Sequence, residues 1–204
     1  MDLQSLLERS ASQHDHLCPR QILGVRMGLC GMKSLGFDSP SGNKRLLVIT
    51  ETDGCFVDGL SAATNCTVGH RTLRVEDYGK VAAIFVDVET GHAIRVVPLL
   101  DIRQRACAGI EDEAHRYMTQ MQMYQTMTDE EMFTLVEVRL LVSIESIVSR
   151  PGLRVTCDMC GEEIMNEREV RRNGMALCRS CAGASYYQPV GQEVAFYKFL
   201  SEKP

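Results

Sequence analysis

Residues 14–19 (HDHLCP) place two histidines, an aspartate and a cysteine in one short run that ends in proline. Imidazole nitrogens and cysteine thiolates bind transition metals, and a thiolate is also a nucleophile. Packing of a core does not require so many such side chains in one place. His14, His16 and Cys18 therefore hold a metal ion, form an activated thiol, or lie in an ordinary polar loop.

A second segment, residues 51–70 (ETDGCFVDGLSAATNCTVGH), carries cysteines close to acidic and imidazole groups. If residues 55–65 are helical, Cys55 and Cys66 lie along one stripe of the helix, and Asp58 lies beside Cys55. If the fold brings this segment to the HDHLCP run, nitrogen and sulfur ligands from both segments can coordinate one transition metal ion.

Cys18 also stands at a position that changes its chemistry. Pro19 suits the first position of a helix, so Cys18 is expected close to the N-cap. The free amides of the first turn and the positive end of the helix dipole then face the sulfur, and both favour the thiolate over the thiol. Metal binding and nucleophilic attack both require a thiolate.

Four cysteines near the C-terminus form the most specific motif in the chain. Residues 157–181 contain two Cys-x-x-Cys pairs separated by 17 residues. Each pair can present two sulfurs to one ion from a tight turn, and two pairs complete the tetrahedral four-sulfur site that suits zinc. A closed site of this kind is structural rather than catalytic. A redox motif and an iron–sulfur cluster are the weaker alternatives. The predicted zinc ligands are Cys157, Cys160, Cys178 and Cys181.

Composition narrows the class of protein. The chain has 204 residues, nine cysteines and a formal net charge of -5. An odd number of cysteines without a recognisable export signal argues against a disulfide framework, so we expect a cytoplasmic protein. The acidic charge gives no global reason to expect nucleic acid, and no apolar stretch approaches the length of a membrane span. Cys30 and Cys107 are expected to be buried, and His92 and His115 are not expected to be ligands.

Hydrophobic periodicity and turn residues predict the elements that must position these groups. Helices are expected over residues 2–12, from Pro19 to Gly36, over 55–65 and over 99–128. Strands are expected over residues 45–52, on both sides of a turn at Glu89–Gly91, and over 132–144 as a final core strand. Arg150-Pro151-Gly152 then breaks the pattern. We therefore expect two domains, residues 1–150 and residues 151–204.

These segments resemble the FmdE family of formylmethanofuran dehydrogenase components over residues 10–100. The HDHLCP run is similar to the opening His-Gly-His-x-Cys-Pro signature of that family, although Arg20 stands where glycine is usual and would add positive charge beside the site. The C-terminal module is similar to the zinc finger that many members carry. The other matching segments are LGVRMG (23–28), TDGCFVD (52–58), NCTVG (65–69), DYGK (77–80) and IRV (94–96).

The resemblance implies an α+β core with a mixed or antiparallel sheet, flanking helices and a metal-binding cleft. A small treble-clef-like zinc-binding domain would follow, and the protein would form a homodimer. A second transition metal, expected to be zinc, would occupy the cleft beside the structural zinc of the finger. The cleft ligands would be His16, Cys18 and Cys55, with His14, Asp58 and Cys66 as further candidates.

Three functions are consistent with these residues. The first, which the resemblance implies, is a metal-binding accessory protein of one-carbon metabolism, associated with the molybdenum or tungsten enzyme that reduces carbon dioxide onto methanofuran in methanogens. The second is a stand-alone metal-dependent enzyme, in which Asp58 or His14 moves a proton or Cys18 acts as the nucleophile. The third is a metal-sensing or redox-sensing regulator, whose contact with nucleic acid the acidic charge disfavours.

Overall fold

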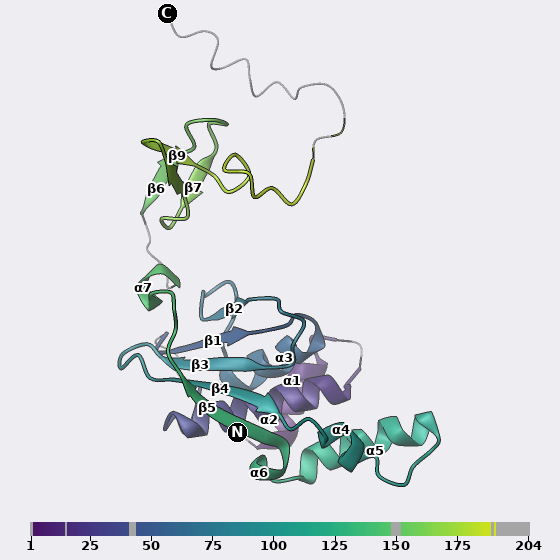
Figure 1. Ribbon diagram of the computed structural model, residues 1–204. Coiled ribbons are helices and arrows are strands. Elements are labelled where there is room, and N and C mark those ends of the chain that lie inside the picture. The colour runs from purple at the N-terminus through teal and green to yellow at the C-terminus, as the bar shows by residue number, and fades with distance from the viewer. Residues whose placement is uncertain (1, 15, 41–43, 148–151, 189, 191–204) are drawn as a thin grey trace, which may run out of the picture. The chain divides into compact units, whose positions relative to one another are not determined.

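The computed structural model describes residues 2–14, 16–40, 44–147, 152–188 and 190. The chain divides into two compact units, Met1–Ile144 and Glu145–Pro204. The first unit is an α+β domain, and the second is a small cysteine-rich module built from short strands (Figure 1). Asp15 and the predicted linker residues Arg150 and Pro151 lie outside the described residues.

A five-stranded mixed sheet forms the centre of the first unit, in the order β2-β1-β3-β4-β5. β1 pairs in parallel with β2 and antiparallel with β3, and the remaining pairs are antiparallel. Every residue of β1 is buried, as expected for a central strand rich in branched apolar side chains. The predicted α+β class with a mixed sheet is therefore confirmed. The strands are β1 (Leu46–Thr50), β2 (Leu73–Val75), β3 (Ala83–Asp87), β4 (Ala93–Pro98) and β5 (Phe133–Val138).

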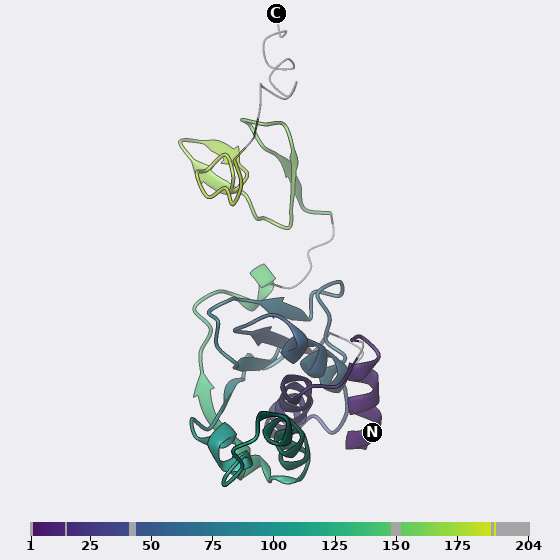
Figure 2. The same cartoon turned by 90° about the vertical axis from the view of Figure 1, so that its right-hand side faces the viewer.

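Three helices lie on one face of this sheet: α1 (Leu3–Ala11), α2 (Pro19–Ser34) and α3 (Cys55–Thr64) (Figures 1 and 2). α2 is the central one, because it contacts β3 and β4 as well as both neighbouring helices. Ile22 and Val25 of α2 are completely buried in the core. A helix surrounded in this way must be apolar on most of its circumference, which explains its sequence.

α2 and α3 approach each other most closely at two glycines. A Cβ atom added to Gly24 would lie 2.2 Å from the carbonyl oxygen of Phe56, and one added to Gly59 would lie 2.2 Å from that of Gln21. Real side chains do not make contacts this short, so the two backbones can pack together only where both residues are glycine. Gly59 lowers the helix propensity of α3, but helix packing requires it. This crossing holds the N-terminal ends of α2 and α3 close together.

The predicted single helix over residues 99–128 is wrong. This segment forms two helices, α4 (Ile102–Ala106) and α5 (Glu113–Thr126). Gly109 lies between them with a left-handed φ of 76°, and the side chain of Asp112 then caps the first turn of α5. A positive φ ends a helix and a new N-cap starts the next, so local backbone chemistry overrides the apolar periodicity.

The predicted core strand over residues 132–144 is only partly correct. β5 ends at Val138, and most of its residues are exposed because it forms the edge of the sheet. Short helices flank this strand, α6 (Asp129–Met132) and α7 (Ile144–Ile147). The earlier helices and the hairpin at Glu89–Gly91 form close to their predicted bounds. None of the described helices is long and apolar enough to cross a membrane.

The second unit consists of two antiparallel strand pairs. Its strands are β6 (Arg154–Thr156), β7 (Glu163–Met165), β8 (Val170–Arg172) and β9 (Met175–Leu177), paired β6 with β7 and β8 with β9. One Cys-x-x-Cys turn connects β6 to β7, and the other follows β9. The buried residues of its small core include Ile164 and Leu177 together with Cys157. So small a core does not stabilise a domain by itself, which is consistent with a fold that depends on a metal ion.

Candidate metal sites

Two cysteines from separate helices meet in the first unit. Cys18 is the N-cap of α2 and Cys55 is the first residue of α3, and their sulfur atoms lie 3.3 Å apart. Both side chains are partly exposed. The N-terminal ends of both helices therefore face one pair of sulfurs, which we call the dithiol site. The predicted N-cap position of Cys18 is confirmed. The fold also brings the two segments together through these two cysteines.

A buried glutamine fixes the backbone of Cys18. Gln21 is completely buried, and its Oε1 accepts a 2.8 Å hydrogen bond from the amide of Cys18. Its Nε2 donates a 3.0 Å hydrogen bond to the carbonyl oxygen of Ser10 in α1. The glutamine therefore completes a capping box at the start of α2 and also ties this end of α2 to the last turn of α1.

His14 and Asp58 contact each other, and they lie four residues before Cys18 and three residues after Cys55 in the sequence. Nδ1 of His14 lies 3.1 Å from Oδ2 of Asp58, which belongs to the first turn of α3. The ring of His16 lies edge to face with that of His14, with 6.3 Å between ring centroids. Both imidazoles are exposed, between the end of α1 and the start of α2.

Burial and neighbouring groups change the pKa of the Cys55 thiol. Burial, followed by the hydrogen bond to Cys18, raises the pKa of Cys55 to about 11, while the positive charge of Arg20 acts in the opposite direction. Arg20 thus has the electrostatic effect on the site that its position in the motif predicts. In the absence of a metal, Cys55 is therefore a thiol at neutral pH, and a metal ion must displace its proton.

Tyr117 is a neighbour of the dithiol site that the sequence did not indicate. Its hydroxyl lies 3.4 Å from the carbonyl oxygen of Leu17 and donates a weak hydrogen bond to it. Burial, followed by the electrostatic effect of Cys18 and Cys55, raises the pKa of Tyr117. The residue comes from α5, 100 positions from Leu17, and no local pattern marks it.

The dithiol site contributes two ligand atoms at short range. Among the described residues, groups of three or more potential ligand atoms within 4.8 Å of one another occur only at the four C-terminal cysteines. The imidazole of His16 does not complete a set of three with Cys18 and Cys55 at that distance. His92 pairs with Glu137 and His115 with Asp112, away from any such group.

The structure does not bring Cys66 to the site. Its side chain is 3% exposed, and the sulfur lies 3.5 Å from the carbonyl oxygen of Leu46. It follows the C-terminal end of α3, and a helical rise of 1.5 Å per residue places it about 16 Å from Cys55 along the axis. The stripe that joins these two cysteines is therefore too long for one ion. Cys30 and Cys107 are buried, as predicted.

The DYGK segment supports the turn that precedes Cys55. The carbonyl oxygen of Glu51 accepts hydrogen bonds from the amides of Tyr78 and Lys80. The carboxylate of Glu51 forms two hydrogen bonds with the guanidinium of Arg95, at 2.6 and 2.7 Å. This pairing lowers the pKa of Glu51. Motif residues far apart in sequence therefore share one structural task, which is to hold the end of β1 where α3 begins.

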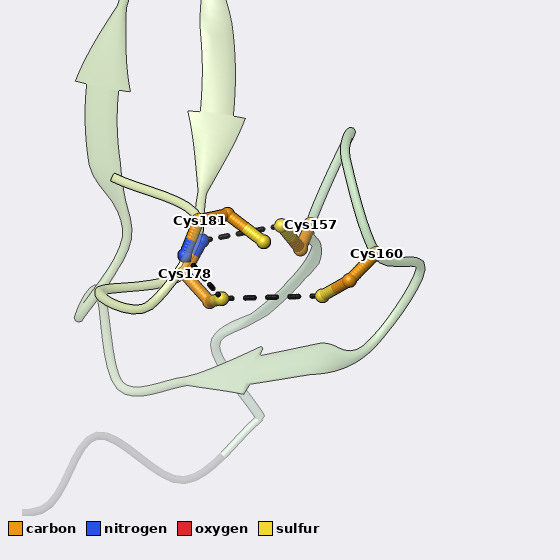
Figure 3. A group of neighbouring side chains, drawn as sticks. All are labelled: Cys157, Cys160, Cys178 and Cys181. Atoms are coloured by element: carbon orange, nitrogen blue, oxygen red, sulfur yellow. Dashed lines mark hydrogen bonds between the residues drawn. The ribbon is translucent and has the colours of Figure 1, made fainter. Parts of the chain in front are cut away.

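The second unit gathers its four cysteines into one group. Their ligand atoms all lie within 4.8 Å of one another (Figure 3). The sulfur of Cys157 accepts a hydrogen bond from the amide of Cys178, and the sulfur of Cys178 accepts one from the amide of Cys181. Gly161 adopts a left-handed φ of 77° directly after the first pair. Sulfurs at these separations, with amide donors aimed at them, fit a tetrahedral zinc ion.

The four cysteines of the finger differ in their pKa values. Burial raises the pKa of Cys157, but backbone amide donors, including those of Cys160 and Cys178, outweigh this effect and lower it to about 6. Burial and the neighbouring thiols raise the pKa of Cys181. Four adjacent thiolates repel one another, so a divalent cation is needed before all four can be deprotonated.

The chain combines an α+β domain, which carries two cysteines at helix N-termini, with a four-cysteine finger. Models of known protein families match both parts. The family model described as "FmdE, Molybdenum formylmethanofuran dehydrogenase operon" matches residues 13–134. The model described as "Prokaryotic dksA/traR C4-type zinc finger" matches residues 151–187. The first match covers more than half of the chain, so the chain belongs to the FmdE family. The resemblance that the sequence motifs indicated is confirmed, and the finger supports a structural zinc.

Two known proteins are similar over most of the chain. A protein of Archaeoglobus fulgidus, named as a probable S-adenosyl-L-methionine-binding protein, is 30% identical over 94% of this chain and 56% of its own length. The chain therefore spans about half the length of this curated relative. A tungsten formylmethanofuran dehydrogenase FmdE-like protein from Syntrophus aciditrophicus matches with a TM-score of 0.61 and 22% identity, over 92% of this chain and 96% of that one. At this identity the likeness shows the fold alone.

Proposed function

We propose that this protein is a metal-binding accessory protein of one-carbon metabolism, in which the dithiol site holds a transition metal in addition to the zinc of the finger. The 3.3 Å distance between the sulfurs of Cys18 and Cys55 carries the proposal. Two thiolates on one tetrahedral zinc, each with a bond of about 2.3 Å, lie about 3.8 Å apart. A small side-chain rotation therefore suffices for both sulfurs to bind one ion.

Further ligands for this ion would come from the residues around the dithiol site. His16 is the expected third ligand, because its exposed imidazole can turn without disturbing the core. His14 and Asp58 supply alternative nitrogen and oxygen donors. A mixed set of sulfur and nitrogen ligands suits zinc among the common divalent ions.

Metal analysis of the purified full chain tests this proposal. We expect two zinc ions per chain in the wild type and one in the Cys18→Ser/Cys55→Ser variant. Cys66→Ser is the matched control, because it removes a cysteine thiol that lies away from the site and should retain both ions. A single ion in the wild type, unchanged in the double variant, would overturn the proposal.

The partner proposed for this accessory role is a molybdenum or tungsten enzyme; the family's description names the molybdenum enzyme, and the name of the Syntrophus protein includes the tungsten one. The family membership supports this assignment. Affinity purification from native cells under mild conditions should recover a molybdopterin enzyme, and recovery of the protein alone would contradict the association. The proposed homodimer predicts twice the monomer mass in light scattering at micromolar concentration, and a monomer mass would contradict it.

A second candidate is a stand-alone metal-dependent enzyme, which the 3.1 Å contact between His14 and Asp58 favours. A carboxylate that orients an imidazole beside a metal site is a common arrangement for proton transfer. A bound ion would supply Lewis acidity, while Asp58 and His14 would hold and move the proton. X-ray absorption at the dithiol-site metal separates the two candidates. Four protein ligands would support a structural or accessory role, and three would support an enzyme.

S-adenosylmethionine is a ligand worth testing on either hypothesis. The Archaeoglobus relative that carries it in its name is similar across 94% of this chain. Calorimetric titration with S-adenosylmethionine should be carried out on both the metal-loaded wild type and the Cys18→Ser/Cys55→Ser variant. Saturable binding in the wild type alone would assign the ligand to the dithiol site. No heat in either protein would exclude this ligand for the chain.

A further inference from the structure

Cys18 and Cys55 have the geometry of a reactive pair as well as that of a metal site. Their sulfurs are 3.3 Å apart and hydrogen-bonded, and both side chains are accessible. A disulfide needs a bond of about 2.05 Å, so bonding would require the sulfurs to move about 1.3 Å closer. We propose that Cys18 and Cys55 form a reversible disulfide by exchange with a small-molecule disulfide of the glutathione type. If the dithiol site also binds a metal, as the proposed function states, the disulfide and metal-bound states exclude each other.

The exchange balances in two steps. The thiolate of Cys18 attacks one sulfur of the small disulfide, and the sulfur–sulfur bond of that molecule breaks as one thiolate leaves. The sulfur of Cys55, after it loses its proton to solvent, attacks Sγ of Cys18 in the mixed disulfide, and the second small thiolate leaves. The protein loses two electrons and two protons, and the small disulfide gains both to give two thiols.

The helix crossing makes the second step faster than release of the mixed disulfide. The close packing at Gly24 and Gly59 lies within two turns of the N-terminal ends of α2 and α3, so the two cysteines cannot drift apart. Gln21 fixes the backbone of Cys18 from the other side. A second thiol held at this distance reacts as an intramolecular group with a high effective concentration.

The other cysteines do not compete for this reaction in the folded, zinc-loaded protein. Cys30, Cys66 and Cys107 are at least nine-tenths buried, which denies a small disulfide the in-line approach that exchange requires. The four cysteines of the finger would be held as zinc thiolates. The reaction is therefore selective for the dithiol site.

The test uses the full chain, loaded with one equivalent of Zn²⁺ for the finger and then exposed to oxidised glutathione. Samples are quenched in acid and analysed by intact mass and peptide mapping. We expect the wild type to lose two hydrogen atoms, to carry no glutathione, and to yield a Cys18–Cys55 cross-linked peptide. Cys18→Ser and Cys55→Ser should each retain one glutathione on the remaining cysteine, because the second step is removed. A wild type that stays reduced, or that accumulates the glutathione adduct as the variants do, would overturn the dithiol assignment.

A second arm separates this inference from the proposed function. Preincubation with a second equivalent of Zn²⁺ should slow disulfide formation at least tenfold, and the oxidised protein should bind one ion instead of two. Disulfide formation that Zn²⁺ does not slow would support the redox pair and contradict the dithiol-site metal. Two bound ions without any disulfide would support the metal and overturn the redox inference.

Discussion

The amide nitrogen of Cys18 lies 2.8 Å from Oε1 of Gln21, and the side chain of Gln21 has no exposed surface. A completely buried amide side chain is uncommon unless its hydrogen bonds are satisfied. In this protein both ends of the amide are used, by Cys18 and by Ser10. Gln21 is therefore a positioning residue for the dithiol site, although it supplies no metal ligand itself.

Gln21→Met tests this positioning role. The substitution preserves volume but leaves the Cys18 amide and the Ser10 carbonyl without their partners, so we expect a loss of about 2–4 kcal/mol in the free energy of unfolding. Gln4→Met is the control, because Gln4 is exposed in α1 and its replacement should change stability little. Urea unfolding followed by circular dichroism measures both. Equal stability of the Gln21 variant and the wild type would contradict the structural role of this hydrogen bond.

Gly24→Ala tests whether the helix crossing sets the distance between the two sulfurs. The added methyl group would meet the carbonyl oxygen of Phe56 at 2.2 Å, so α2 and α3 must separate. We expect a loss of about 3 kcal/mol in stability and weaker metal binding at the dithiol site. Gly69→Ala adds the same methyl group where nothing lies within 4 Å and should change neither quantity. Comparable effects of the two substitutions would show that the helix crossing does not set the distance between the two sulfurs.

The finger should depend on its metal while the first unit does not. Cys178→Ser removes one of four sulfur ligands, and metal binding of about 10–16 kcal/mol is what stabilises folded zinc fingers. We expect residues 152–188 to lose dispersed amide resonances in NMR spectra, while the resonances of the first unit remain unchanged. Arg179→Ala, an exposed position in the same turn, is the control. A finger that remains folded without its metal would contradict the structural assignment of the zinc.

Acid should destabilise the first unit through Asp87. The side-chain hydrogen bond from Arg45 lowers the pKa of Asp87 from 3.8 to about 2. A carboxyl whose pKa is depressed in the folded state contributes stability above its unfolded pKa and loses that contribution as the pH falls through the folded value. We expect a loss of about 1–2 kcal/mol between pH 4 and pH 2, reduced by the partial exposure of Arg45.

Urea unfolding at several pH values measures this contribution. In Arg45→Met the same decline between pH 4 and pH 2 should be smaller, because the pKa of Asp87 returns toward its ordinary value. Zinc loss from the finger in acid affects both proteins alike and cancels in the comparison. Parallel pH profiles of the two proteins would contradict the assignment to this pair.

Elements with strong local signals could be predicted from the sequence. Pro19 after Cys18 marked the start of α2, and the turn at Glu89–Gly91 marked the hairpin between β3 and β4. The prediction of a helix over residues 99–128 was wrong because Gly109 interrupts a continuous apolar periodicity. The prediction of β5 as a core strand was wrong because β5 lies at the edge of the sheet. Which strand lies at an edge depends on the pairing of all the strands, and the sequence of one strand does not show it.

The four-cysteine finger could be predicted from local spacing alone. Two residues between cysteines define a tight turn wherever they occur, so Cys157 and Cys160 predict their own geometry. Formation of the dithiol site, in contrast, depends on the tertiary structure. Cys18 and Cys55 are 37 residues apart, and they meet because two glycines let their helices cross closely. Cys66 shares a helical stripe with Cys55, yet the length of the helix keeps it away. Short-range chain geometry is local, whereas the meeting of distant helix ends depends on how the whole core packs.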